Sequence, residues 1–133
     1  MSTRMLEVQQ KVFQALLTNT NLVSKVTGIF DSVPENTNLP YVTFGKIASQ
    51  PLNTKTSDGE MISVSMDIWS EKQGKKETVD IMSEIELTLK TELVLDTATL
   101  ISQRVINREA WEETYGLFTG TIEFEIKTIW EEI

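Results

Sequence analysis

The chain has 133 residues, of which 40% are apolar and 24% are charged, and this size and composition predict one soluble globular domain with a single core. It contains neither Cys nor His, which excludes disulfides, thiolate nucleophiles, Cys-bound or His-bound metals and the histidine general base. The net charge of −8 disfavours tight binding to nucleic-acid phosphates. No run reaches the roughly 20 apolar residues of a membrane helix, so we expect a protein that is made in the cytoplasm and has no membrane partner.

The first predicted element is an amphipathic helix over residues 4–17, because its apolar side chains recur mostly at three- and four-residue spacings. They are Met5, Val8, Val12, Phe13, Leu16 and Leu17. Residues 18–21 are Thr and Asn, whose side chains compete with the helical backbone. The helix should therefore end there, and residues 22–26 should add at most one turn. Residues 29–30 begin a short extended piece, and residues 34–40 form a surface loop between two prolines.

Two strands are predicted next. Residues 41–47 are aromatic and β-branched, and residues 60–70 alternate between an apolar and a polar face. The apolar face carries Ile62, Val64, Met66 and Ile68. Between the strands, residues 50–59 are polar and turn-forming, which is longer than the roughly two to five residues that a hairpin needs. We therefore expect a long loop that is mobile in the free protein and docks on a partner.

The second half of the chain predicts one helix and two strands. After Gly74, residues 75–90 form a helix whose apolar stripe is Val79, Met82, Ile85 and Leu89. Residues 99–112 give a weaker strand pattern, with Ile101, Val105 and Trp111 in phase. A turn at residues 115–116 leads to residues 117–130, which alternate most clearly of all. The apolar face of this last strand is Phe118, Ile122, Phe124, Ile126 and Trp130.

This order of elements predicts an α+β fold, in which two helices pack on one face of a mostly antiparallel sheet of about four main strands. We expect a single domain over residues 1–133. Its predicted core includes Val12, Leu16, Val64, Met66, Met82, Ile122 and Phe124. Trp111 and Trp130 are expected in the core or at its edge. Trp69 lies on the opposite strand face, where the pattern leaves intramolecular packing and an interface equally open.

The sequence predicts no catalytic site. Its 20 acidic residues offer two carboxylate pairs, Asp67 with Glu60 and Glu123 with Glu125. Alternating carboxylates on a strand are usually a solvated face, and neither an Asp-x-Asp loop nor a Glu-x-x-His pair is present. The glycines fit no phosphate-binding pattern. We therefore expect no catalytic, cofactor-binding or metal-binding residues and no enzymatic activity.

The sequence does offer candidate interface residues. Leu52 is the one large apolar side chain of the polar segment 50–59, in which Lys55 and Asp58 are candidates for a polar rim. Trp69 is followed by a cluster of lysines that gives this part of the chain a different charge from its acidic end. The complete set of candidates is Leu52, Lys55, Asp58, Trp69, Lys72, Lys75 and Lys76.

Several segments together resemble one protein family. They are Val12–Leu17, Ile29–Pro34, Leu39–Gly45, Asp58–Glu60, Val64–Ser70, Gly74, Tyr115–Leu117 and Ile122–Phe124. In this order and spacing they are similar to the tail-completion, or tail-to-head joining, proteins of long-tailed phages, which are also the tail terminators of gene-transfer particles. The resemblance covers nearly the whole chain and is weakest over residues 93–99.

The resemblance implies a structural virion protein that caps the finished tail tube at the junction with the head. It implies a ring, expected to hold six copies, whose hole passes DNA without binding it specifically. The implied partners are the tail tube protein and a head-completion or connector protein, and no cofactor is implied. Two other classes stay open from the residues alone. One is an acidic inhibitor that mimics DNA, but it would need an unbroken carboxylate face, which the lysines of residues 72–76 interrupt. The other is an enzyme that depends on carboxylates.

Overall fold

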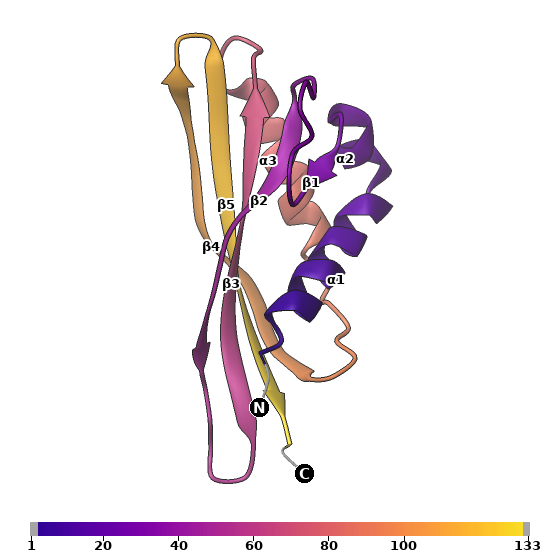
Figure 1. The fold of residues 1–133 in the computed structure, drawn as a ribbon, viewed down its shortest axis with the longest axis vertical. Helices are drawn as coiled ribbons and strands as arrows, with labels where there is room; N and C mark the ends of the chain where they lie inside the picture. Colours follow the sequence, from indigo (N-terminus) through magenta and orange to yellow (C-terminus); the bar gives the residue numbers. More distant parts are fainter. Residues whose placement is uncertain (1–2, 132–133) are drawn as a thin grey trace.

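The computed structural model describes residues 3–131, so the ends of the predicted domain, residues 1–2 and 132–133, lie outside the described part. The helices are α1 (Met5–Thr18), α2 (Thr20–Lys25) and α3 (Lys76–Thr88). The strands are β1 (Ile29–Phe30), β2 (Tyr41–Pro51), β3 (Asp58–Ser70), β4 (Thr99–Thr114) and β5 (Leu117–Trp130). They form one sheet in the order β1-β2-β3-β5-β4 (Figure 1).

The sheet confirms the predicted α+β class. β1 runs parallel to β2, and the other three pairings are antiparallel. β1 adds a two-residue fifth strand to the four predicted main ones, and α2 is a six-residue helix where we expected at most one turn. Asn19 explains this, because its side chain accepts a hydrogen bond from the backbone of Leu22 at 3.1 Å and so caps the new helix.

The core lies between the helices and one face of the sheet. All seven core residues predicted from the sequence are at most 5% exposed. Val12 of α1 and Ile85 of α3 belong to the same buried cluster as Phe124 of β5, so α1 and α3 cover the same sheet face, as predicted. Val79 is a correction, because it is 43% exposed. The buried stripe of α3 is instead Thr78, Ile81, Met82 and Ile85, followed by Leu89 at the helix end.

The hairpin between β2 and β3 extends further than the sequence predicts. The strands stay paired as far as Pro51 and Glu60, so the connection is residues 52–57 rather than 50–59. Proline is tolerated here because β1 covers only Val42 and Thr43 of β2, which leaves the rest of β2 as a free edge that needs no N–H donor. The long loop on which the docking prediction was based is therefore shorter than expected.

Strand β4 departs most from its predicted pattern. Its register with β5 shifts after Leu100, Val105 and Glu112, and each extra residue interrupts the alternation of side chains. Ile101 and Trp111, predicted to face the core with Val105, are consequently 55% and 38% exposed. Val105 is partly buried against the core, together with Leu100 and Ala110. Trp130 does lie at the core edge, half-buried beneath the Arg4 guanidinium at 3.8 Å from the ring centroid.

Candidate functional site

Leu52, Lys55 and Asp58 come together at one end of the molecule, at the tip of the β2–β3 hairpin. The loop is held by its own hydrogen bonds, since the N–H of Leu52 donates to the carbonyl of Gly59 and the N–H of Thr54 to that of Ser57, each at 2.8 Å. A side chain at Gly59 would meet the Leu52 carbonyl at 2.6 Å, so only glycine allows this close approach. Leu52 itself is 37% exposed.

Trp69, Lys72, Lys75 and Lys76 come together at the opposite end, where β3 leads into α3. This connection, residues 71–75, is called the lysine loop here, and Lys76 directly follows it. β3 has 13 residues and rises about 3.3 Å per residue, which separates the two groups of candidates by roughly 40 Å. The sequence predicted the members of both groups but not their division between the two ends.

The lysine loop is anchored through Ser70, which is fully buried. The Ser70 hydroxyl donates to the Glu77 carboxylate at 2.7 Å and accepts from the backbone N–H of Lys72 at 3.1 Å. The side chains of Lys72, Lys75 and Lys76 are exposed, and none of them forms an ion pair within residues 3–131. Together with Lys76, the loop therefore presents a net positive charge, because its one carboxylate, that of Glu71, is outnumbered by three exposed lysines.

An aromatic row crosses the sheet face that carries no helix in the described part of the chain. The strand register places Tyr41 of β2 beside Trp69 of β3, and Thr119 of β5 lies between Trp69 and Trp111 of β4. Phe30 of β1 extends this aromatic row, because its ring meets the Tyr41 ring edge to face with the ring centroids 6.0 Å apart. Thr119 is only 2% exposed although it lies on this uncovered face. It lies between Trp69 and Trp111, so aromatic side chains flank it on both sides in the row.

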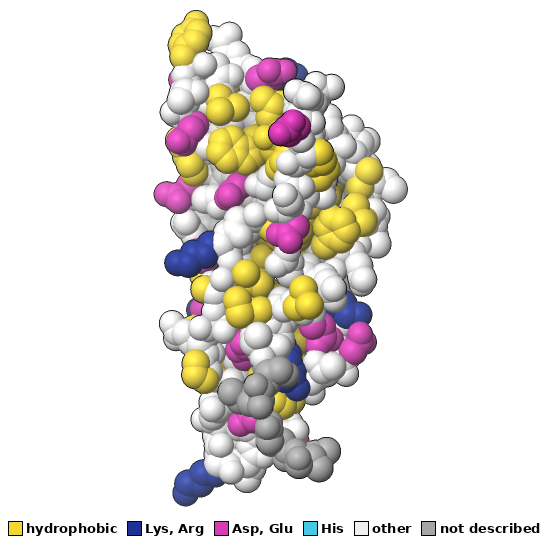
Figure 2. Space-filling model, viewed as in Figure 1, with side chains coloured by type: hydrophobic (Ala, Val, Ile, Leu, Met, Phe, Trp, Pro, Cys, Tyr) yellow, Lys and Arg dark blue, Asp and Glu magenta, His cyan; other side chains and the backbone are white. Residues whose placement is uncertain are grey.

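An acidic row lies next to the aromatic one. The same register aligns Thr43, Asp67, Thr121 and Glu109, which places two carboxylates beside the aromatic row. In Figure 2, hydrophobic side chains are visible over the upper parts of the strands, with acidic side chains among them. Sequence reasoning singled out only Trp69 of these rows as an interface candidate, because only the register shows which residues are neighbours.

The predicted carboxylate pairs form no catalytic arrangement. Glu60 and Asp67 lie on opposite faces of β3, and the buried Glu60 carboxylate accepts hydrogen bonds from the Thr3 hydroxyl and, at 2.7 Å, from the backbone N–H of Arg4. Glu123 and Glu125 share the uncovered face, where Glu125 pairs with Arg104 at 3.1 Å. Within residues 3–131 no three acidic side chains are grouped to hold a metal ion.

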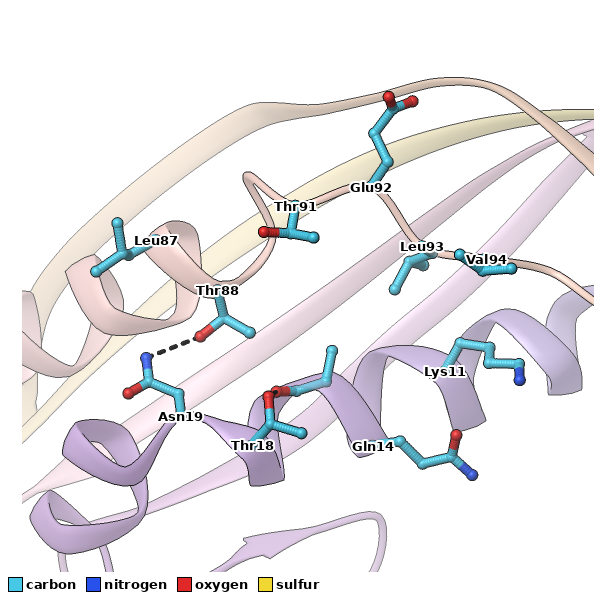
Figure 3. A pocket seen from close by; sticks show the side chains of 11 residues that line it. Lys11, Gln14, Thr18, Asn19, Leu87, Thr88, Thr91, Glu92, Leu93 and Val94 are labelled. Atoms are coloured by element: carbon cyan, nitrogen blue, oxygen red, sulfur yellow. Dashed lines mark hydrogen bonds between the residues drawn. The ribbon is translucent and has the colours of Figure 1, made fainter.

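A hollow of about 540 Å³ lies between α1 and the end of α3 (Figure 3). Two of its threonine hydroxyls are bonded to the backbone, because Thr18 donates to the carbonyl of Ala15 at 2.7 Å and Thr88 to that of Glu84 at 2.9 Å. The amide of Asn19 closes one end by donating to the Thr88 hydroxyl at 2.8 Å. The contact of Asn19 links the start of α2 to α3.

Two carboxylates with shifted pKa values also serve the structure. A two-pronged hydrogen bond from Arg108, at 2.6 and 2.7 Å, lowers the pKa of Glu86 and ties α3 to β4. Partial burial raises the pKa of Glu7, but hydrogen bonds from Thr97 and the backbone of Asp96 lower it by more. Both groups hold elements together rather than shape a reactive site. Among the described residues, no helix is long and apolar enough to cross a bilayer.

The fold resembles two known structures. It is similar to a chain of the virion of the native gene transfer agent particle, with a TM-score of 0.87 and 19% identity over 97% of this chain and 100% of that one. It is also similar to the gp17 protein of bacteriophage SPP1, with a TM-score of 0.56 and 21% identity over 94% of this chain and 92% of that one. At these identities the likeness establishes a shared fold.

Sequence comparison gives the family. A search of curated proteins found no match. The family model for the tail completion protein gp17 matches residues 10–129, which include every described strand except the last residue of β5. Because the match covers most of the chain, this protein belongs to the tail completion protein gp17 family.

Proposed function

We propose that this tail completion protein acts as a single structural domain that closes the end of the tail tube and forms the tail side of the joint to the head. In this proposal six copies form a ring, and DNA passes through its hole without specific binding. The ring contacts the tail tube protein on one side and a head-completion or connector protein on the other. The protein performs this role in the virion without catalysis or a cofactor.

The division of the candidate interface residues between two ends supports this proposal. Leu52, Lys55 and Asp58 lie at one end of β3, and Trp69 and the lysine loop lie roughly 40 Å away at the other. A ring subunit at a joint needs several separate contact surfaces, because it touches its neighbours in the ring as well as the bodies that it joins. A protein with one partner, such as an inhibitor that mimics DNA, needs only one such surface.

The charge of the chain supports the passage of DNA. A ring with a net charge of −8 per subunit binds DNA phosphates weakly, because binding depends on basic side chains that displace the counterions of DNA. A duplex can therefore move through the hole without being held. The acidic surface is also interrupted, since Glu125 is neutralised by Arg104 and the lysine loop is basic. A DNA mimic would instead need an unbroken array of carboxylates.

Electron microscopy of tails made with and without this protein tests the proposal. Without it, we expect tails with an abnormal end or abnormal length that do not join heads, and addition of the purified chain should restore joining. Normal tails and full joining in its absence would refute the proposed role. Binding to a host DNA enzyme together with normal tails would support the inhibitor instead.

The hairpin tip is proposed to dock on one of the two bodies. Replacement of residues 52–57 by an Asn-Gly turn should leave the fold intact, because the rest of the hairpin stays paired, but should prevent tails from joining heads. Circular dichroism checks the fold and an assembly assay checks joining. Full joining by a folded variant would remove this tip from the interface.

We also propose that the ring closes only on the tail end. Its subunits are of modest size and ordinary hydrophobicity, whereas obligate oligomers usually expose larger apolar surfaces when separated. Sedimentation of the purified chain at micromolar concentration should therefore show a monomer. A stable hexamer without tails would contradict this conditional assembly.

A further inference from the structure

The uncovered face of the sheet has the chemistry of a site for basic side chains. The faces of indole rings attract cations, and in the aromatic row Trp69 and Trp111 lie beside the carboxylates of the acidic row. The molecule already uses this interaction once, where the Arg4 guanidinium lies 3.8 Å from the centroid of the Trp130 ring. A second basic side chain, from outside the subunit, would find both a ring face and a carboxylate at the aromatic row.

The carboxylates of this face are not neutralised by the subunit itself. Asp67, Glu109 and Glu123 form no ion pair within residues 3–131. The two arginines of the adjacent strand β4 are already engaged, Arg104 with Glu125 and Arg108 with Glu86. The acidic and aromatic rows therefore form one surface with free negative charge.

The lysine loop supplies the complementary charge on the other side of the molecule. Lys72 and Lys76 line a hollow with Lys25 and the start of α3, which packs on the covered face of the sheet. The acidic residues Glu77 and Asp80 share this lining. Glu77 is turned inward by its hydrogen bond from Ser70, whereas Asp80 and Glu71 are exposed. Within residues 71–76 three exposed lysines still outnumber the one carboxylate, so this segment has a net positive charge. A subunit thus has an acidic aromatic front and a basic back.

We propose that the lysine loop of one subunit docks on the aromatic and acidic rows of the next, so that the ring is built from front-to-back contacts. Both surfaces lie at the same end of the long axis, because Trp69 is only three residues before Lys72 (Figure 1). If the ring axis runs parallel to the long axis of the subunit, neighbouring subunits contact each other at the same level along that axis. In a closed ring each such contact joins two different surfaces, one from each neighbour. This inference rests on the ring of the proposed function and names its subunit contact.

Cysteine cross-linking tests the contact directly, because the chain has no native cysteine. The variant with both Glu109→Cys and Gln73→Cys should form a disulfide-linked ladder up to the full ring when it is oxidised on tails. Glu109→Cys with Leu52→Cys is the matched control, since Leu52 lies at the other end of the subunit, and it should stay monomeric on the gel. Absence of the ladder in the test pair, while wild-type rings form on tails, would overturn the proposal.

Charge reversal provides a second test. Asp67→Lys with Glu109→Lys, or Lys72→Glu with Lys76→Glu, should each lower the number of closed rings on tails roughly tenfold or more, since like charges repel across the contact. The variant with all four substitutions should restore ring closure. Circular dichroism confirms folding, and the cross-linking result stands even if one reversed variant misfolds.

The outcomes separate this inference from the proposed function. If wild-type rings are present on tails but both reversed variants close normally, the front-to-back contact is wrong and the proposed function stands. If reversed variants close rings but fail to join heads, the two rows bind a different partner and the inference is likewise overturned. If the wild-type chain is absent from tail ends, the proposed function itself fails.

Discussion

The two faces of the sheet are made by alternate residues of the same strands, yet they follow different rules. In β5 the covered face carries Ile122, Phe124 and Ile126, each at most 1% exposed, whereas Glu123 and Glu125 between them are half-buried and face away from the helices. The covered face is filled by packing and determines stability. The residues of the uncovered face do not have to fill a core, so their side chains are available for contact with other molecules.

The largest expected loss of stability comes from a cavity in the covered face. Phe124→Ala removes a side chain that is 1% exposed and should cost roughly 3 to 5 kcal/mol in the free energy of unfolding, through lost burial and a residual cavity. Thr121→Ala on the uncovered face of the same strand is the matched control and should cost less than about 0.5 kcal/mol. Chemical denaturation measures both, and a loss below about 1 kcal/mol for Phe124→Ala would refute the difference between the faces.

A smaller effect comes from overfilling the same face. A side chain at Gly120 would meet Cγ2 of Thr78 at 2.7 Å and the backbone carbonyl of Glu109 at 3.1 Å. Gly120→Ala should therefore push α3 away from β5 and cost about 1 to 3 kcal/mol. Thermal unfolding followed by circular dichroism measures the loss, and an unchanged midpoint would mean that α3 lies further from the sheet than described.

A gain in stability is expected where the covered face buries a polar atom. Thr78 is 0% exposed, and its hydroxyl has no hydrogen-bond partner within residues 3–131. Thr78→Val keeps the shape and removes the unpaired hydroxyl, which should stabilise the protein by about 1 kcal/mol. Thr78→Ser keeps the hydroxyl, removes a methyl group and serves as the control. Destabilisation by the valine would show that the hydroxyl is bonded in solution.

The smallest effect depends on pH. Arg108 lowers the pKa of Glu86 from its ordinary value of 4.5, so the folded state favours the charged carboxylate. The resulting stability is complete above the pKa of the unfolded state and disappears as pH falls through the lower folded value. Denaturation curves of the wild type and Glu86→Gln should differ near neutral pH and converge in acid. Curves that stay equally far apart in acid would exclude this ion pair as the cause.

The regular part of the fold follows from local pattern, and the exceptions have physical causes. Strict alternation in β3 and β5 predicted the covered face correctly, because both strands lie inside the sheet and pair on both sides. β4 is an edge strand with three register shifts, and alternation cannot predict where a bulge inserts a residue. This is why Trp111 was expected in the core or at its edge although it is 38% exposed.

The candidate surfaces were only partly predictable for a related reason. Trp69 and the lysines stand out by residue type, but the aromatic row depends on the register of four strands, which no single segment contains. The hairpin loop shows the opposite error, because its polar composition suggested ten unpaired residues where backbone pairing leaves six. Composition identifies loops poorly when an edge strand is polar.

The bulges of β4 have a consequence for the unassembled protein. A straight edge strand of 16 residues would offer a ladder of free N–H and C=O groups on which strands of other copies could add without limit. The three register shifts and the charges of Arg104, Glu109 and Glu113 disrupt that ladder. The exposed edge of the sheet is therefore protected against the unlimited addition of strands that leads to fibrous aggregates.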